Sequence, residues 1–563
     1  MLKIKIVSGL EKPFLDQRIE DFEPLEHISA LRGERLTLML LTYLEDEGDG
    51  VFLKRLRPRL SGALAPFASL KRVRSVPVTM ASRHAIADPT LLRRTPGLYP
   101  DLIEPLGYGG EIRPYAYALE ALLIDIEIPE DAEAGEDELR VSVSCPALDG
   151  AVLAEAAVRI EVIGAVLPRQ KLKYTQWLHC DCLANYYGVD SFSEEHWRII
   201  ESFAACAVKN GINMLLTPLF TPPVDVVKGK KWRRTTQLIG VTLKSGEYSF
   251  DYTKLDRWVE MCDRVGVKYF EMAHLFSQGG CEYSTKVMAT VDGEYKCLFG
   301  WHTPSSNPEY HRFLRIFIKD LLSHMEKSGN RDRCFFHISD EPKEEHLPAY
   351  KQATEAIKEV LGENVIMDAL SDFSFYSEGI VKAPVVYIGR TKPFLDAGVK
   401  GLWAYYCGQS ATCSGNNIAM TGARTRWLGA QLFKYNIEGF LHWGYNFYNN
   451  CDSVDPINPF TELSGEGWVT AGDAFSVYPA RDGKPLESLR LLAMKAGIDD
   501  ISAMELCASL YSKAEVIAAW EEAVGAPTEI DACVNSASTL LAAREKINAM
   551  IRAKIRFSPR KYK

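Results

Sequence analysis

Asp340 and Glu341 are the residues of this chain whose type and spacing most clearly suggest chemistry. They follow the mainly apolar segment 335–338 and Ser339, and Pro342 comes next. Such a run is typical of a buried strand, and a proline ends strand pairing. Because burying two carboxyl groups without a task is expensive, we predict that Asp340 and Glu341 form a catalytic pair. Two other acidic pairs, 194–195 and 499–500, fall in helical patterns, where we expect solvated positions.

The adjacency of the two acids limits the mechanism that they can share. Neighbouring strand residues point to opposite faces, so Asp340 and Glu341 cannot face each other across a sugar as an ordinary retaining pair does. A chain turn at Pro342 would let both reach one substrate. This geometry favours substrate assistance, in which a 2-acetamido group of the sugar is the nucleophile. Glu341 would protonate the leaving group and later activate water, and Asp340 would hold the acetamido N–H.

Short apolar runs alternate with helical patterns from residue 171 onward. Eight such runs predict strands, and with the helical patterns between them they indicate a (β/α)8, TIM-like barrel in the α/β class. A doubly wound sheet is the alternative, and the lack of a Gly-rich phosphate loop after any strand disfavours it. The predicted strands are 172–178, 212–217, 267–271, 334–338, 365–369, 385–388, 401–406 and 439–443.

Three of the intervening helices have clear start or stop signals. Ser193 can cap a helix that ends before Gly211, and Asn307 precedes a proline that opens a second helix. A third helix has apolar residues at three- and four-residue spacing over 255–265 and stops at Gly266. Local signals therefore define where these helices begin or end.

The N-terminal part of the chain has a different pattern. Alternating apolar runs separated by Pro, Gly and Asp clusters predict an antiparallel β-sandwich. Residues 164–171 are typical of a linker, and a predicted hairpin at 474–478 precedes helices from residue 486 onward. The predicted domains are an N-terminal β-sandwich (1–168), a catalytic barrel (169–450), and a small C-terminal cap of a hairpin and helices packed on the barrel (451–563).

Functional groups of a barrel lie where its strands end, on the carboxyl-terminal face. The strand ends of this chain carry histidines, carboxylates and aromatic residues, which suit a sugar because carboxylates accept hydroxyl protons and aromatic rings cover its apolar face. For the histidines a satisfied buried side chain is the alternative, and for the tryptophan it is barrel packing. The predicted substrate-binding residues are His179, Asp181, His274, Asp368, Tyr405, Trp443, Tyr445 and Asn446.

Several motifs resemble those of glycoside hydrolase family 123, the β-N-acetylgalactosaminidases, and of the wider domain of unknown function family 4091. Asp340-Glu341 at the end of the fourth strand resembles the family 123 catalytic pair. The resemblance implies a terminal β-linked 2-acetamido sugar cleaved with retention. It also implies that Tyr405 bonds the acetamido carbonyl and that Trp443 forms a wall against the sugar. The other motifs are Tyr99-Pro100-Asp101, 402–405, Arg424-x-Arg426-Trp427, 439–446, 472–479, 488–490 and 497–500.

Other function classes fit the sequence less well. A metallohydrolase would need H-x-H after the first strand, but the chain has His179-Cys180-Asp181, and strands five and six end without histidine. We therefore expect no metal and no cofactor. The absence of a G-x-S-x-G elbow argues against a serine hydrolase. The alternatives that stay open are an inert carbohydrate-binding protein on a glycosidase scaffold and a glycosidase for a non-acetamido sugar.

Charge and composition narrow the partners further. The 563 residues include 65 Lys plus Arg and 74 Asp plus Glu, and the formal charge of −9 argues against nucleic acid. No segment has 18 consecutive apolar residues and the N-terminus lacks a signal pattern, so we expect no membrane partner and a cytoplasmic protein. The 13 cysteines lack framework spacing and predict free thiols. The expected partner is a carbohydrate, and the oligomeric state is not predicted.

Overall fold

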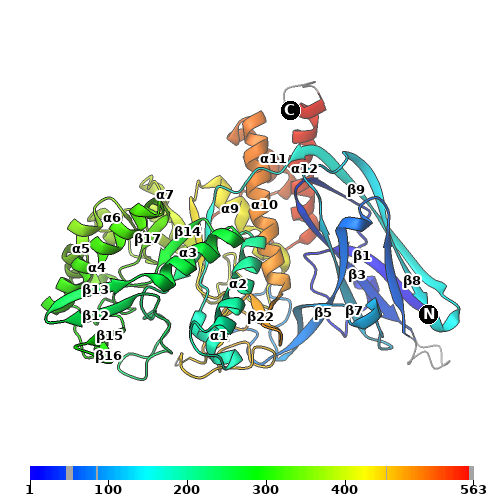
Figure 1. Cartoon of the computed structure of the whole chain (residues 1–563). Coiled ribbons are helices and arrows are strands. Elements are labelled where there is room, and N and C mark those ends of the chain that lie inside the picture. Colours follow the sequence, from blue (N-terminus) through cyan, green and yellow to red (C-terminus); the bar gives the residue numbers. More distant parts are fainter. Residues whose placement is uncertain (46–54, 84–85, 452, 557–563) are drawn as a thin grey trace.

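The structure is a computed structural model that describes residues 1–45, 55–83, 86–451 and 453–556. Figure 1 shows a β-rich N-terminal region beside a second region in which helices surround a central sheet. The C-terminal helices, drawn in orange and red, stand where the two regions meet. These helices are α10 (Leu489–Leu510), α11 (Lys513–Val524) and α12 (Ala537–Arg556).

The N-terminal region contains two sheets that share one apolar core. The larger has the order β1 (Leu2–Ser8), β3 (Arg35–Leu44), β7 (Leu119–Glu127), β5 (Ala68–Val78) and β6 (Gly97–Pro105). The smaller has the order β2 (His27–Arg32), β9 (Ala151–Val166), β8 (Gly135–Cys145) and β4 (Arg57–Ser61). Alternate residues of both sheets, among them Leu38, Ile124, Val141 and Ile160, are fully buried in one cluster. The alternating pattern accounts for the smaller sheet, which has one apolar face. β3 and β7 are apolar on both faces, and their second face packs in a separate cluster with Leu489 and Leu492 of α10.

One strand pair differs from the predicted antiparallel arrangement. β2 pairs with β9 in parallel, whereas the other pairs of the two sheets are antiparallel. Parallel strands need a long connection, and here it comprises β3 to β8, which belong to both sheets. β9 also continues to Val166, so that part of the segment predicted as a linker is strand.

The second region is built on an eight-stranded parallel sheet. Each of the eight predicted segments overlaps one of its strands, and seven contain the strand completely, which confirms the strand prediction. The fold is therefore a mixed α/β fold with one parallel sheet and separate, mainly antiparallel sheets. The parallel sheet has the order β18 (Val365–Ile366), β17 (Cys334–Phe336), β14 (Tyr269–Met272), β11 (Met214–Thr217), β10 (Lys173–Gln176), β21 (Gly439–His442), β20 (Trp403–Tyr405) and β19 (Val385–Tyr387).

The two edges of this sheet approach each other. Ala369, just beyond β18, forms a parallel bridge with Val385 of β19. The Leu370 N–H donates to the Val385 carbonyl at 2.8 Å, and the Val385 N–H donates to the Asp368 carbonyl at 3.1 Å. The sheet therefore curves far enough for its outer strands to be hydrogen-bonded to each other, and the carboxyl ends of its strands surround a common space.

The helices between the strands begin and end where the local signals predict. Ser193 caps α2 (Glu194–Lys209), and the Asn307 side chain accepts from two backbone N–H groups at the start of α4 (Pro308–Lys327). α3 (Thr253–Val265) ends at Gly266, whose φ of +96° suits a residue without a Cβ. Capping is decided by residues close in sequence, which is why these boundaries were predictable.

A four-stranded sheet on the loop side of the parallel sheet was not predicted. It has the order β13 (Glu247–Asp251), β12 (Gly240–Lys244), β15 (Val287–Val291) and β16 (Glu294–Phe299). β12 and β13 interrupt the connection that leaves β11, and β15 and β16 interrupt the one that leaves β14. Both connections start at carboxyl ends of parallel strands, so the added sheet (lower left in Figure 1) extends the end of the region where a barrel carries its site.

The C-terminal residues contact both regions. The hairpin pairs β22 (Val477–Pro479) with β23 (Pro485–Glu487), slightly later than predicted. Asp500 of α10 is 1% exposed and accepts from Arg426 at 2.7 Å and Arg544 at 2.8 Å, so the expectation of a solvated pair at 499–500 was wrong. Arg544 of α12 also pairs with Glu34 of the N-terminal region at 2.7 Å. The predicted domain boundaries stay a proposal.

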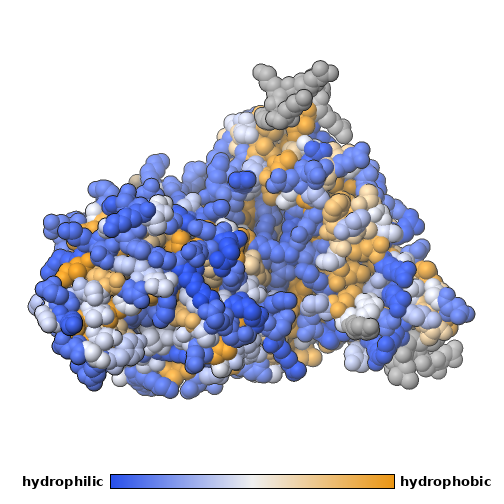
Figure 2. Space-filling view, viewed as in Figure 1, coloured by the Kyte–Doolittle hydropathy of each residue, from blue (hydrophilic) through white to orange (hydrophobic). Residues whose placement is uncertain are grey.

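The polarity of the surface and the state of the cysteines are as the amino-acid composition predicts. Figure 2 shows polar residues over most of this face of the second region, and a band of apolar residues toward β9 in the N-terminal region. Among the described helices, none has the length and apolar character needed to cross a membrane. All thirteen cysteines are free thiols, as predicted.

Candidate active site

The chain turns at Glu341 rather than at Pro342. β17 ends at Phe336, and Glu341 has a φ of +44°, a conformation that is unfavourable for a residue with a side chain. Its N–H donates to the Ala369 carbonyl at 2.9 Å, which holds the turn against the next strand. Because of this turn, the two adjacent carboxyl groups of Asp340 and Glu341 line the same cavity.

This cavity has a volume of about 470 Å³ and lies at the carboxyl ends of the parallel strands. Every strand of the sheet except β19 contributes to its wall, either at its end or in the loop that follows. The contributions from the sheet are Trp177 after β10, Asp225 after β11, Gln278 after β14, Asp340 and Glu341 after β17, Ala369 after β18, Tyr405 and Cys407 from β20 and its loop, and Leu441 and Trp443 from β21 and its loop.

Asp340 is buried and leans toward the β14 side of the cavity. It is 5% exposed, and its Oδ2 accepts from Gln278 Nε2 at 2.8 Å. Burial raises the pKa of Asp340 well above its usual range, and the nearby Glu341 and Asp225 carboxylates raise it further. Asp340 therefore keeps its proton to a higher pH than an exposed aspartate does.

Glu341 leans toward the opposite side, where β20 lies. The Tyr405 hydroxyl donates to Glu341 Oε1 at 2.8 Å. Burial raises the pKa of Tyr405, and the Glu341 charge raises it further, so Tyr405 keeps its proton and acts as a donor. The two acids of the pair thus have different neighbours, which allows them different roles.

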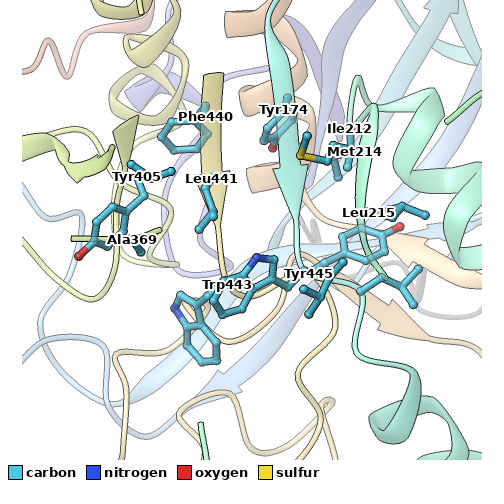
Figure 3. Packing of buried hydrophobic residues seen from close by; sticks show 14 of the residues in the cluster. Tyr174, Ile212, Met214, Leu215, Ala369, Tyr405, Phe440, Leu441, Trp443 and Tyr445 are labelled. Atoms are coloured by element: carbon cyan, nitrogen blue, oxygen red, sulfur yellow. The ribbon is translucent and has the colours of Figure 1, made fainter. Parts of the chain in front are cut away.

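Two tryptophans of the cavity wall have their rings fixed by carboxylates behind them. Trp443 is 6% exposed, and its Nε1–H donates to Asp473 Oδ2 at 3.1 Å. The Trp177 Nε1–H donates to Glu271 Oε1 at 2.7 Å. Figure 3 shows Trp443 beyond the end of the strand that carries Phe440 and Leu441, between Tyr405 and Tyr445. Rings held in this way can form a rigid flat surface for a ligand.

Beneath the cavity lies a group that we call the buried polar cluster, formed by Glu271, His337 and Asp368. His337 bonds Asp368 through Nδ1 at 2.9 Å and Glu271 through Nε2 at 2.7 Å. Burial lowers the pKa of His337, but the bonds to the two carboxylates outweigh it and raise the pKa to about 9. Asp368 also accepts from the Ile338 N–H at 3.0 Å, so the buried polar cluster orients the loop that leads to the catalytic pair.

His274 stacks on this cluster and offers the only arrangement among the described residues that suggests a metal site. His274, His337 and Asp368 each present a ligand atom, and these atoms lie within 4.8 Å of one another. Both nitrogens of His337 are already bonded to carboxylates, however, and its ring lies 4.1 Å from that of His274 at 22°. Stacked rings direct their lone pairs in nearly parallel planes, which do not converge on one ion at the roughly 2.0–2.1 Å of a zinc–nitrogen bond. These residues therefore do not fit a metal.

His179 and Asp181 lie behind the wall and share Arg233. Arg233 donates to His179 Nδ1 at 2.9 Å and to Asp181 Oδ1 at 2.6 Å. Because arginine only donates, His179 must carry its proton on Nε2, which donates to the Trp443 carbonyl at 2.9 Å. Burial and Arg233 lower the pKa of His179 to about 3, so the ring stays neutral. Burial favours a neutral Asp181, but Arg233 lowers its pKa below the usual value.

Tyr445 and Asn446 also point away from the cavity. The Tyr445 hydroxyl donates to the Phe203 carbonyl at 2.9 Å, and in Figure 3 its ring lies on the far side of Trp443 from Tyr405. Asn446 accepts from the His179 N–H at 2.8 Å and donates to its carbonyl at 3.1 Å. Of the ten predicted site residues, four line the cavity (Asp340, Glu341, Tyr405, Trp443) and six lie outside its lining (His179, Asp181, His274, Asp368, Tyr445, Asn446).

Several lining residues were missed by the sequence analysis. Trp177 lies near the end of a predicted strand, so its position was a usable signal. Asp225 lies in a long connection without regular structure, and Arg83 comes from the N-terminal region, where its N–H donates to Gln409 Oε1 at 2.8 Å. No local pattern marks either residue. Burial raises the pKa of Asp225 to about 7, with Arg233 opposing and Glu341 adding to the rise.

Carboxyl groups and tryptophan faces that share one cavity at the carboxyl ends of a parallel sheet are the arrangement of a glycoside hydrolase. The model of the glycoside hydrolase 123 catalytic domain matches residues 177–507. The chain therefore belongs to glycoside hydrolase family 123. The comparison with curated proteins found no match.

Solved structures support the fold. A family 123 glycoside hydrolase from Clostridium perfringens, studied for glycolipid glycan hydrolysis, superposes with a TM-score of 0.73 at 15% identity over 99% of this chain and 98% of that chain. A β-glucuronidase from Parabacteroides merdae has a TM-score of 0.28 at 10% identity, over 90% of this chain and 51% of that chain. A family 5 mannosidase from Rhizomucor miehei has 0.30 at 12% identity, over 59% and 93%. The last two superpose too loosely to support an argument.

Proposed function

We propose that this glycoside hydrolase cleaves terminal β-linked 2-acetamido sugars of the N-acetylgalactosamine type by a substrate-assisted retaining mechanism. Glu341 gives its proton to the glycosidic oxygen while the acetamido carbonyl oxygen attacks C1 and the leaving group departs. Asp340 accepts the acetamido N–H and stabilises the resulting oxazolinium-like cation. Water then attacks C1, Glu341 takes the water proton, and the C1–O bond to the acetamido group breaks. Two inversions at C1 give retention.

The observation that carries this proposal is the turn at Glu341. It brings two adjacent carboxyl groups into one cavity, and their partners separate their roles. Gln278 holds Asp340 on the β14 side, and Tyr405 contacts Glu341 on the β20 side. One acid can thus reach the glycosidic oxygen while the other reaches the substituent on the neighbouring carbon.

Tyr405 and Trp443 are the proposed substrate contacts. Tyr405 donates to Glu341, and on substrate binding its hydroxyl turns to the acetamido carbonyl. Trp443 covers the apolar face of the sugar, since its ring is fixed by Asp473. The six predicted residues outside the lining shape the cavity from behind in this proposal. In this proposal the second region is a closed (β/α)8 barrel. The reaction uses no metal and no cofactor.

A conventional retaining glycosidase for a non-acetamido sugar is the second candidate. Asp225 lines the same cavity as Glu341, and it is a third carboxyl that could attack C1. In that case the sugar would need no acetamido group, and the intermediate would be a glycosyl ester of Asp225. A sugar-binding protein without activity is the non-enzymatic alternative, and any glycoside hydrolysis excludes it.

A panel of aryl glycosides tests the proposal. The enzyme should cleave 2-acetamido-2-deoxy-β-galactosides and leave the matching 2-hydroxy galactosides intact. A thiazoline mimic of the bicyclic intermediate should inhibit tightly because it resembles the state that Asp340 stabilises. Asp340→Asn should lower kcat by on the order of 10²-fold or more, comparable with loss of one preorganised electrostatic contact. Comparable cleavage of plain galactosides, with a glycosyl ester trapped on Asp225, would overturn it.

A further inference from the structure

Asp225 occupies a fixed position in a long connection. The chain leaves β11 at Thr217 and forms no helix or regular strand before β12 begins at Gly240. Asp225 itself has a φ of +55°, the left-handed conformation that side chains rarely adopt. Such strain persists only where the surroundings hold it.

Two contacts hold this strained position. The Asp225 N–H donates to Gln278 Oε1 at 2.7 Å. Arg233 donates to the carbonyl of the preceding residue, Val224, at 3.1 Å, and its guanidinium is fixed by Asp181. Arg233 and Asp181 are both almost fully buried, so the clamp is rigid. The backbone position of Asp225, from which its carboxyl group enters the cavity wall, is therefore held by protein contacts alone.

The carboxyl group that this clamp presents has no protein partner. Among the described residues, neither oxygen of the Asp225 side chain accepts a hydrogen bond, and Oδ2 is shielded from solvent. A shielded acceptor without a hydrogen bond lowers the stability of the folded protein, so a purely structural role does not explain why Asp225 is placed here. The Asp225 carboxyl group also lines the cavity, so a donor on the ligand can provide the hydrogen bond that the protein does not.

Gln278 defines where Asp225 lies relative to the catalytic pair. Its Oε1 accepts from the Asp225 backbone N–H, and its Nε2 donates to Asp340 Oδ2 at 2.8 Å. The Gln278 side chain therefore lies between Asp225 and Asp340. Glu341 lies on the other side of Asp340, next to Tyr405. The order along the wall is thus Glu341, Asp340, Gln278 and Asp225. On a pyranose, the glycosidic oxygen at C1, the nitrogen at C2 and the hydroxyl at C3 follow in the same order.

We infer that Asp225 is a specificity-determining residue that accepts a hydrogen bond from the 3-hydroxyl of the bound sugar, held in place by Gln278. This inference rests on the proposed function, since it uses the roles of Glu341 and Asp340 to orient the sugar. It means that the cavity selects sugars with a free 3-hydroxyl, and that a substituent on that oxygen blocks binding.

Deoxy substrates combined with Asp225 variants test this inference. For the wild type, kcat/KM should be on the order of 10-fold lower for the 3-deoxy than for the parent 4-nitrophenyl 2-acetamido-β-galactoside, as expected for the loss of one hydrogen bond. The 4-deoxy analogue should keep its rate. Asp225→Ala should lower kcat/KM on the parent by the same factor and cause no further loss on the 3-deoxy analogue. Asp225→Asn keeps the shape if the alanine variant fails to fold, and should give a smaller loss of the same pattern.

Asp190→Asn is the matched control, because Asp190 is a fully exposed aspartate outside the cavity and should change nothing. Equal rates of the wild type on the parent and 3-deoxy substrates would overturn the inference. A loss confined to the 4-deoxy substrate, or a glycosyl ester found on Asp225, would overturn it as well.

The outcome can be separated from that of the proposed function. If no 2-acetamido glycoside is cleaved by the wild type, the proposed function fails, and calorimetric binding of free N-acetylgalactosamine and its 3-deoxy analogue then tests Asp225. Tighter binding of the parent that disappears in Asp225→Ala supports the inference, and equal binding of the two sugars overturns it. If cleavage requires the acetamido group but ignores the 3-hydroxyl, only the inference fails.

Discussion

In the buried polar cluster, every carboxyl oxygen of Glu271 and Asp368 and both ring nitrogens of His337 have a protein partner. In the cavity wall directly above, Asp225 has none among the described residues. Both regions bury carboxyl groups, but only the cluster satisfies all of them. This difference indicates two roles for buried carboxyl groups. Those of the cluster stabilise the fold, and the Asp225 carboxyl group of the wall is left able to bind a ligand. Variants in the wall should therefore lower activity, and variants in the cluster should lower stability.

Glu341→Gln in the wall should have the largest effect. Loss of the proton donor should lower kcat/KM by roughly 10²- to 10⁴-fold on substrates with poor leaving groups, and far less on activated aryl glycosides, which need little protonation. The free energy of unfolding should stay within about 0.5 kcal/mol of the wild type. Glu345→Gln, an exposed glutamate of the same loop, is the control and should be inert. Equal loss on both substrate classes would show that Glu341 is not the acid.

His337→Gln should have the largest effect on stability. Removing the cation leaves Glu271 and Asp368 as buried carboxylates without their partner, which should lower the free energy of unfolding by about 3–5 kcal/mol in urea titrations. His324→Gln is the control, because His324 pairs with Asp256 at 2.6 Å at a partly exposed site and should cost less than about 1 kcal/mol. Similar losses for the two variants would contradict the distinction between cluster and surface.

The stability difference between wild type and His337→Gln should depend on pH. The folded-state pKa of His337, about 9, lies above the ordinary 6.5, so its stabilisation is fully present below pH 6.5 and is lost as the pH rises to about 9. The difference should narrow by about 3 kcal/mol over this range. Burial lowers the pKa of Lys12 to about 7, which makes the stability of both proteins rise with pH in the same window, so only the difference isolates His337. A constant difference from pH 6 to pH 9 would exclude a charged His337.

Tyr405→Phe should have a smaller effect, because one neutral hydrogen bond is lost. We expect kcat/KM on a 2-acetamido glycoside to fall by about 2- to 10-fold. Tyr406→Phe is the matched control. Tyr406 follows in sequence, is buried, and its hydroxyl has no hydrogen-bond partner among the described residues. If the two variants behave alike, the Tyr405 hydroxyl has no part in binding.

Metal removal should have no effect at all. The stacked geometry of His274 and His337 does not fit an ion, so exhaustive chelation should leave the hydrolysis rate unchanged. Recovery of a lost rate on adding zinc would replace the acid–base proposal with a metal mechanism and would place a ligand site in the buried polar cluster.

The strands of the parallel sheet and the caps of its helices were predictable because both depend on residues close in sequence. The eight apolar runs identify the strands, and Ser193, Asn307 and Gly266 mark helix ends. The added sheet after β11 and β14 was missed, since its strands are half exposed and lack a continuous apolar run. The same limit applies to the parallel pair of β2 and β9, which depends on chain direction rather than on pattern.

The sequence by itself determined that Asp340 and Glu341 follow a buried strand, because the apolar run and the acids after it are close in sequence. Only the tertiary structure decided which other polar residues face the cavity. Asp181 pairs with Arg233 and His179 is held by Asn446, and these partners are 52 and 267 positions apart in the sequence. These contacts direct Asp181 and His179, both predicted to bind substrate, away from the cavity, while Gln278 and Arg233 hold Asp225 in the wall. Burial predicts that a polar group needs a partner, but whether the partner is protein or ligand depends on residues that only folding brings together.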